Sequence, residues 1–154
     1  IVREGRFQVI WQTGKYYERE MDEFMRGRDA RGIWRGAFIE RMDLAYAAAD
    51  VVVARSGAGT VSELCLVGKA VVFVPSPNVA EDHQTKNAMA LADRGAALVV
   101  PDREAVARVF SEVGRLLADD AVRSEMEKNI RALAVADSAD RVADEILKVV
   151  KRSE

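Results

Sequence analysis

The chain has 154 residues, of which 49% are hydrophobic and 31% are charged, and this is the ordinary balance of a globular domain that can bury a core. Its net charge of −2 gives no electrostatic reason to expect nucleic acid or an anionic membrane surface as a partner. No apolar run approaches the roughly 18 residues that a membrane-spanning helix needs, and the single cysteine excludes an internal disulfide and favours a reducing compartment, the cytoplasm.

Short apolar strands alternate with helical patterns along the first two thirds of the chain. Runs rich in Val, Ile, Phe or Trp predict strands, and apolar residues three or four positions apart predict helices. The predicted strands are 6–14, 32–39, 50–57, 69–75 and 96–101, and the predicted helices are 15–28, 43–49, 59–68 and 82–95. Because the run at 50–57 is almost continuously apolar, we expect that strand to be buried on both faces.

Beyond Pro101 the alternation stops and three amphipathic helices are predicted, with apolar residues at helical spacing from Val106, Val122 and Val142 onward. Five strands that alternate with helices predict an α/β fold with a parallel, Rossmann-like sheet. Right-handed crossovers then place helices on both faces. In such a sheet, ligands bind beyond the carboxyl ends of the strands.

The third predicted strand ends in "RSGAGTVSE", a loop of small residues that opens a helix. The backbone N–H groups of Ala58, Gly59 and Thr60 lie at the helix start, where unpaired amides and the helix dipole favour a phosphate. Glu63 lies one turn further on the same side, and its carboxylate can accept hydrogen bonds from ribose hydroxyls. The alternative is an ordinary capped helix, in which Glu63 complements the dipole or forms a capping box with Thr60.

The fourth predicted strand ends in a second polar loop, "PSPNVAEDHQTKNA". Gln84 and Asn87 are three residues apart and share a helix face, and amides that donate and accept hydrogen bonds suit sugar hydroxyls. The alternative is a polar first turn with Asp82 as its N-cap and His83 as a hydrogen-bonded surface group.

Other kinds of site are excluded. One histidine and one cysteine cannot form a zinc site, and Cys65, in an apolar helix, is expected to be buried packing. Neither a nucleophile elbow nor a Walker A lysine motif occurs. "GAGTVSE" resembles a dinucleotide fingerprint only loosely, because the acid is Glu63 rather than a residue about twenty positions on, so NAD is not expected.

Taken together, "RSGAGTVSE", "VPSP…EDHQTKNA" and "DRGAALVV" resemble the C-terminal half of the family 28 glycosyltransferases that move N-acetylglucosamine from UDP-GlcNAc to lipid I in peptidoglycan synthesis. The resemblance covers nearly the whole chain, and it is carried by "GAxTxxE" and "QxxNA" at this separation. It implies a GT-B enzyme, with two Rossmann-like domains around a cleft. Residues 1–154 would be the UDP-GlcNAc-binding C-terminal domain, and the N-terminal acceptor domain would be absent.

The resemblance also implies roles for individual residues near the diphosphate and the ribose. Ala58, Gly59 and Thr60 would hold the diphosphate and the sugar through backbone N–H groups and the Thr60 hydroxyl. Glu63 would bind the ribose hydroxyls. These roles agree with those derived above from the first loop.

For the sugar and the base, the resemblance implies a second group of residues. Gln84 and Asn87 would bind the GlcNAc hydroxyls, with His83 adjacent. Ile39 would meet the uracil edge through its backbone. No residue of this chain is expected to be catalytic, because the base that activates the acceptor belongs to the missing domain. The reaction would invert the anomeric centre, with no metal and no cofactor, and UDP-GlcNAc would be the donor substrate.

The resemblance implies further properties of the complete enzyme. It would contact lipid I and the membrane only through the missing domain, and would lie on the cytoplasmic face of the cell membrane. The present chain alone would bind the donor without transferring sugar. Since the chain opens without Met, and with charges where a secretory signal would be apolar, we expect a piece of a longer cytoplasmic chain.

Two departures from the family pattern matter. Gly59 stands where some relatives have a bulkier apolar residue. The glycine-rich loop of the family is absent, together with the first strand of this domain, which should lie between the strands at 6–14 and 50–57. If the first strand has been lost, these two strands should not be paired; direct pairing would indicate a compact variant.

Two alternatives remain open. Another enzyme that uses UDP-sugars, such as a glycolipid glycosyltransferase or a UDP-GlcNAc epimerase, has the same fold. The epimerase would need acid and base residues that this half of the molecule does not supply. A non-catalytic Rossmann-like interaction domain would differ from both, because nucleotides would not stabilise it.

Overall fold

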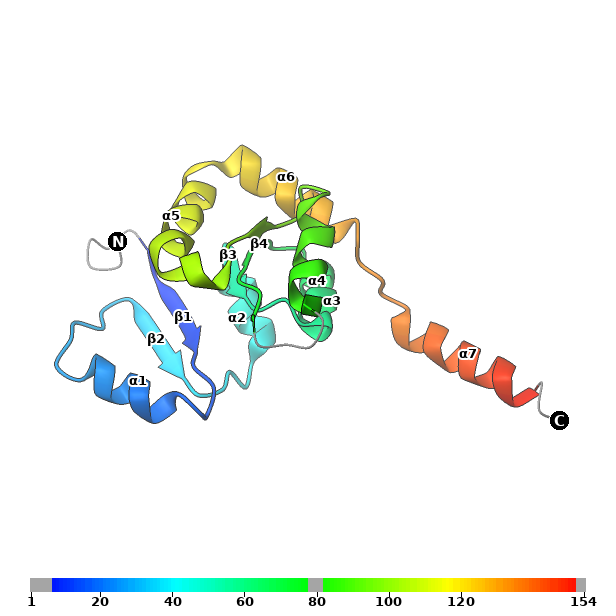
Figure 1. Cartoon of the computed structure of the whole chain (residues 1–154), viewed down its shortest axis with the longest axis horizontal. Helices are drawn as coiled ribbons and strands as arrows, with labels where there is room; N and C mark the ends of the chain where they lie inside the picture. The colour runs from blue at the N-terminus through cyan, green and yellow to red at the C-terminus, as the bar shows by residue number, and fades with distance from the viewer. Residues whose placement is uncertain (1–6, 78–81, 152–154) are drawn as a thin grey trace. The chain divides into compact units, whose positions relative to one another are not determined.

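The computed structural model describes residues 7–77 and 82–151 (Figure 1). The chain divides into two compact units, Ile1–Ala48 and Ala49–Glu154. Within the described residues the strands form two sheets, one in each unit. All strand pairs are parallel, as the alternation of strands and helices predicts.

The first unit is a single βαβ element followed by a helix. Its elements are β1 (Val9–Gln12), α1 (Glu18–Met25), β2 (Ile33–Gly36) and α2 (Met42–Ala48). Val9 lies opposite Ile33 in the register, and Arg35 of β2 forms an ion pair with Asp22 of α1. None of the described residues of this unit is buried, and Trp34 is 50% exposed. The well-packed core therefore belongs to the second unit.

The second unit is built around a three-stranded sheet in the order β3-β4-β5. Its strands are β3 (Val51–Ala54), β4 (Ala70–Phe73) and β5 (Leu98–Val99). The crossover helices are α3 (Ala58–Val67) and α4 (His83–Ala92), and the chain continues through the short 3-10 helix η2 (Asp102–Glu104), α5 (Ala105–Ala118), α6 (Asp120–Arg131) and α7 (Ser138–Lys151). Figure 1 shows α3 and α4 on one side of this sheet and α5 on the other.

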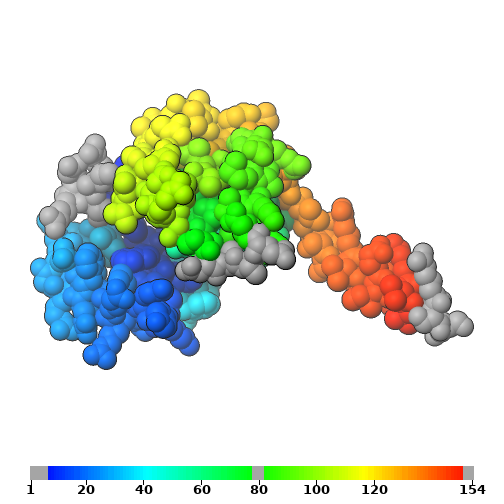
Figure 2. Space-filling view, viewed as in Figure 1, coloured from blue at the N-terminus to red at the C-terminus, as the bar shows by residue number. Residues whose placement is uncertain are grey.

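The core of the second unit is centred on β4, whose four residues are fully buried. Leu116 of α5 and Met126 of α6 pack against this strand in one cluster with Val100. α6 also packs on α3, and Figure 2 shows the 105–131 segment, in yellow tones, forming a continuous surface with the green residues that precede it. Burial on both faces thus explains why β4 is a continuous apolar run.

The predicted elements are confirmed, with each observed strand three to five residues shorter than predicted. Burial on both faces is wrong for the third strand, since Val53 is 47% exposed. β3 lies at the edge of its sheet and has a single paired neighbour among the described strands, so less of it is covered. Gly68 ends α3 as expected, in a left-handed conformation with its N–H donating to the Leu64 carbonyl at 2.9 Å.

Direct pairing between the first and third strands, which would indicate a compact variant, is not observed. β1 pairs with β2, β3 pairs with β4, and the two pairs belong to separate sheets. The missing first strand stays an expectation from the family resemblance.

Candidate functional site

The amino end of α3 follows β3 after a turn of three residues. The N-cap is Gly57, in an extended conformation, and no side chain caps the helix. Ala58 and Gly59 are exposed, and a side chain at Gly59 would meet open space. The first N–H groups of a helix have no partner within the helix. The N–H groups of Ala58, Gly59 and Thr60 therefore face an open region and suit an anion.

The capping-box alternative for this helix is wrong. Thr60 is the third residue of α3 rather than its N-cap, and the first turn contains no acid. Glu63 lies in the second turn and is exposed. Its spacing from Gly59 and Thr60 places it on their side of the helix. A carboxylate one turn behind an anion site is the arrangement predicted for a ribose next to a phosphate.

Ser56 connects this turn to the start of α4. Its side chain is fully buried, and it is the one buried polar side chain among the described residues. Its Oγ donates a hydrogen bond to the carbonyl oxygen of Gln84 at 2.8 Å. Its own carbonyl oxygen accepts from Nδ2 of Asn87 at 3.1 Å. The carboxyl end of β3 is thereby joined to the backbone of Gln84 and to the side-chain amide of Asn87 on α4.

The Gln84 side chain is joined to the end of β4 as well. Its Oε1 accepts a hydrogen bond from the backbone N–H of Ser76 at 2.9 Å. Since an N–H donates only to an acceptor, Oε1 must face Ser76, and Nε2 is left for other partners. By the same argument Asn87 turns Nδ2 toward Ser56 and leaves Oδ1. Neither Nε2 of Gln84 nor Oδ1 of Asn87 has a partner in the described part of the chain.

Arg55 fixes the ends of the strands to one another. Its guanidinium donates to the carbonyl oxygens of Val74 at 3.0 Å and Pro75 at 3.3 Å, just beyond β4. It also forms an ion pair with Asp102, which follows β5. These contacts satisfy carbonyls at the point where the backbone leaves the sheet. They tie Val74 and Pro75, just beyond β4, to the residue that follows β3.

The first residues of α4 differ in part from the prediction. Asp82 occupies the N-cap position, but its φ of 55° is left-handed and its side chain makes no capping bond. Asp82 is therefore the N-cap residue, as the alternative has it, but its side chain does not cap the helix. His83 is exposed, and Gln84 and Asn87 are half-buried. Residues 78–81 of the predicted loop lie outside the described residues.

Ile39 belongs to the first unit, whereas the other seven predicted binding residues belong to the second. Its backbone N–H donates to Oε1 of Gln12 at 2.9 Å, so that group is already hydrogen-bonded. Phe38 beside it is 66% exposed. The role of Ile39 toward a uracil base stays a prediction.

The remaining chemical groups give no sign of another active site. Cys65 is buried in α3, and burial raises the pKa of its thiol, which disfavours the reactive thiolate. Within residues 7–77 and 82–151 no cluster of His, Cys, Asp and Glu could hold a metal ion. Among the helices described, none is both long and apolar enough to cross a membrane.

Arg55, Ser56 and Ser76 are the residues that the sequence reasoning missed. They hold the backbone and the amides in place rather than facing the open side of the site. A signal for Ser56 is present in the sequence: a small hydroxyl residue directly after a buried strand has to find an internal hydrogen-bond partner. The identity of that partner depends on tertiary structure.

Comparison with known proteins gives one family over most of the chain. Residues 2–142 match the glycosyltransferase family 28 C-terminal domain. The chain is 47% identical over 145 residues to the UDP-N-acetylglucosamine--N-acetylmuramyl-(pentapeptide) pyrophosphoryl-undecaprenol N-acetylglucosamine transferase of Parabacteroides distasonis. It is 48% identical over 152 residues to the protein of the same name from Bacteroides thetaiotaomicron. These alignments cover 94% and 98% of the chain but 39% and 41% of the relatives, so the chain spans about two fifths of their length.

Two solved structures are similar to the chain. The crystal structure of Acinetobacter baumannii MurG aligns with a TM-score of 0.78 and 33% identity, over 92% of this chain and 41% of that one. The glycosyltransferase VinC in complex with dTDP aligns with a TM-score of 0.66 over 94% of this chain and 34% of that one. At 21% identity, the likeness to VinC bears on the fold alone.

Proposed function

The chain belongs to the family of glycosyltransferase family 28 C-terminal domains, and from that premise we propose that it is the donor-binding domain of an enzyme that transfers N-acetylglucosamine from UDP-GlcNAc to lipid I. Family membership confirms the resemblance seen in the sequence. The relatives that carry the transferase name are more than twice as long as this chain. The activity of the whole protein is therefore part of the proposal.

One observation carries the proposal: two neighbouring strand ends present complementary groups on the same edge of the sheet. The amino end of α3 offers uncapped N–H groups, which suit the diphosphate of a nucleotide sugar. Glu63, on the same side of that helix, offers a carboxylate for the ribose. Gln84 and Asn87 on α4 offer one donor and one acceptor for the sugar hydroxyls.

The proposed chemistry is an inverting displacement. The acceptor hydroxyl attacks C1 of GlcNAc, the bond from C1 to the diphosphate oxygen breaks, and UDP leaves with the bonding electrons. Negative charge then grows on the diphosphate, where the amides and the dipole of α3 would stabilise it. The base that takes the proton of the acceptor would belong to an N-terminal acceptor domain, so this chain would bind the donor without transferring sugar. No cofactor beyond the donor substrate is proposed.

The complete enzyme would obtain lipid I through that acceptor domain. Lipid I is anchored in the membrane, so the enzyme would work as a peripheral protein on the cytoplasmic face, where UDP-GlcNAc is found. The names of the relatives support the substrates, and the membrane contact follows from the lipid nature of the acceptor.

Binding of nucleotides to the chain itself tests the proposal. Thermal unfolding is measured with UDP-GlcNAc, UDP-galactose, UDP and NADH, each over a concentration series. A ligand at about 100 times its Kd stabilises the folded state by about 2.7 kcal/mol. We expect stabilisation by UDP-GlcNAc and UDP but not by NADH. Stabilisation by NADH alone would overturn the proposal and favour a dinucleotide-binding domain. Stabilisation by none of the four in a folded chain would overturn it and favour an interaction domain.

Glu63→Ala provides the residue-level test of the same proposal. Removing the carboxylate should weaken binding of both UDP-GlcNAc and UDP by about tenfold or more, since a hydrogen bond to a charged group is worth about 1.5–3 kcal/mol. Glu127→Ala, on α6, is a matched control of the same chemistry that should leave both affinities unchanged. Titration calorimetry measures them. Equal affinities in Glu63→Ala and in the unaltered chain would exclude Glu63 from the site.

A further inference from the structure

Ser56 directs both of its hydrogen-bonding groups to a single helix. Its hydroxyl donates to the carbonyl of Gln84, and its carbonyl accepts from the side chain of Asn87. We propose that Ser56 is a positioning residue that sets the sugar selectivity of the site without touching the ligand. This inference rests on the proposed function, because it assigns a role within the same donor site.

Burial is the first reason for this assignment. Ser56 is fully buried between the end of β3 and the start of α4. Buried hydroxyls need a hydrogen-bond partner, and a partner on the same loop or strand would satisfy that need. Ser56 instead bonds across 28 and 31 residues of sequence, to the two positions on α4 that face the sugar in the proposed site. Its contacts therefore fix where α4 begins relative to α3.

The second reason is the orientation that these contacts give to the amides. With Oε1 of Gln84 accepting from Ser76, Nε2 is the end of the amide that is turned away from Ser76 and can donate to a ligand. With Nδ2 of Asn87 donating to Ser56, Oδ1 is the end that is turned away from Ser56 and can accept. A sugar hydroxyl is then expected to accept from Gln84, and another to donate to Asn87. Moving α4 would disturb both requirements at once.

The nucleotide half of the site does not depend on the Ser56 hydroxyl. The N–H groups of Ala58, Gly59 and Thr60 are set by the backbone of α3, whose N-cap is Gly57. Glu63 lies on the same helix. Loss of the hydroxyl should therefore weaken recognition of the sugar and spare recognition of UDP. A residue with a merely structural role would affect both ligands equally.

Ser56→Ala tests this inference, with Ser124→Ala on the exposed side of α6 as the matched control. Titration calorimetry gives the affinity of each variant for UDP-GlcNAc and for UDP. We expect Ser56→Ala to bind UDP-GlcNAc about tenfold more weakly, the size of effect typical of one lost hydrogen bond. Its affinity for UDP should change less than about twofold, and Ser124→Ala should match the unaltered chain for both ligands.

The contrary outcomes are distinct. Equal losses for UDP-GlcNAc and UDP, or no loss for either, would overturn the role of Ser56 while leaving the proposed function in place. Failure of the unaltered chain to bind both ligands would overturn the proposed function, and this inference with it.

If Ser56→Ala does not fold, Gln84→Glu takes its place. Glutamate keeps an oxygen for the Ser76 N–H but replaces the Nε2 donor with an acceptor. Loss of UDP-GlcNAc binding with UDP binding retained is the expected result. Unchanged binding of UDP-GlcNAc would refute the fixed orientation of the amide.

Discussion

At the scale of single residues, the site depends on groups that hold other groups in place. Gln84 and Asn87 were predicted to bind a sugar. In the structure, one end of each side-chain amide is also hydrogen-bonded to a backbone group. An alanine substitution at Asn87 would therefore remove a structural bond together with a ligand contact. Substitutions that change only the free end of an amide are the better probes of the site.

Two glycines give opposite predictions for the free energy of unfolding. Gly68 has a φ of +69°, and a Cβ there would lie 2.5 Å from Nε of Arg131. Gly68→Ala should destabilise the chain by about 1–2 kcal/mol, because L-residues are strained in the left-handed region. Gly59 lies inside α3 with open space around it, so Gly59→Ala should be neutral or stabilising by up to about 1 kcal/mol. Urea unfolding measures both.

The pair also tests the description of α3. If Gly59→Ala destabilised as much as Gly68→Ala, Gly59 would not be in an open helical position. If Gly68→Ala were neutral, the end of α3 at Gly68 would be wrong.

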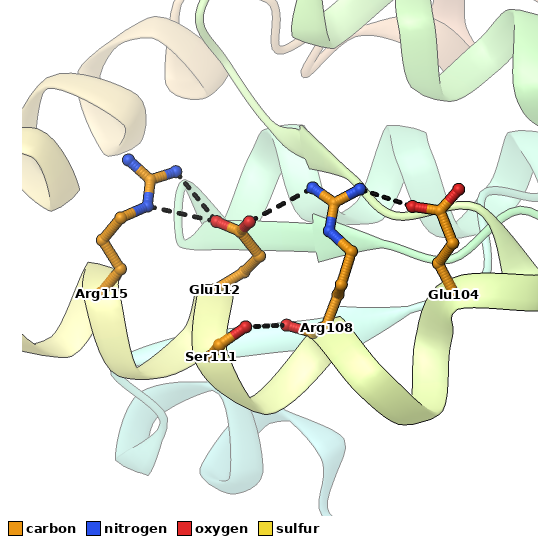
Figure 3. A network of polar contacts seen from close by, with 5 residues as sticks. All are labelled: Glu104, Arg108, Ser111, Glu112 and Arg115. Carbon is orange, nitrogen blue, oxygen red and sulfur yellow. Dashed lines mark hydrogen bonds and ion pairs between the residues drawn. The ribbon is translucent and has the colours of Figure 1, made fainter.

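At the scale of elements, α5 carries a chain of ion pairs along its exposed side. Arg108 bonds both Glu104 and Glu112, and Arg115 bonds Glu112 as well, as Figure 3 shows. The hydrogen bond from Arg108 lowers the pKa of Glu104. Burial raises the pKa of Glu112, but the hydrogen bonds from Arg115 and Arg108 outweigh that effect, and the net shift is downward.

These shifts predict a loss of stability on the acid side. A carboxyl group whose pKa is lower in the folded chain than in the unfolded chain stabilises the fold above its unfolded pKa, here its ordinary value of 4.5. That contribution is lost as the pH falls through the lowered folded value. The urea midpoint of unfolding should fall between about pH 6 and about pH 3, the range in which glutamate side chains titrate. In Arg108→Gln this fall should be shallower than in the unaltered chain. Parallel pH profiles for the two chains would contradict the network.

Helix α7 gives the second prediction at this scale. None of its described residues is buried, and its apolar residues Val142, Ile146 and Val149 are 58–63% exposed. Ending the chain at Asp137 should therefore change the free energy of unfolding by less than about 0.5 kcal/mol, as for other exposed sites. Thermal and urea unfolding of the shortened chain measure this. A loss of several kcal/mol would mean that α7 packs on the rest of its unit.

The order and type of the elements could be predicted from the sequence because the spacing of apolar residues and the glycines that end helices are local signals. Apolar runs marked the strands, and Gly68 marked the end of α3. The exposure of Val53 could not be predicted in this way, since it depends on which strand lies at the edge of a sheet. The start of α3 was predicted to within one residue, but its cap was not, because Gly57 caps the helix without a side chain.

At the scale of the whole molecule, the chain divides into two units, and seven of the eight predicted binding residues lie in the second. Both polar loops were found because each follows a strand, and parallel strands bring their carboxyl ends to one edge. The bonds that join the loops, through Arg55 and Ser56, were not found, because they connect residues far apart in sequence. Ile39 belongs to the other unit, so its contribution to the site rests on the family resemblance.

The central claim is that the carboxyl ends of β3 and β4 bind a nucleotide sugar. Its most direct test is NMR chemical-shift mapping of the ¹⁵N-labelled chain during titration with UDP-GlcNAc. We expect the largest shifts at the backbone amides of Ala58, Gly59 and Thr60 and at the side-chain amides of Gln84 and Asn87. Titration with UDP should reproduce the first group of shifts and omit the second. Saturable shifts confined to α5 or α7, or none in a folded chain, would contradict the account.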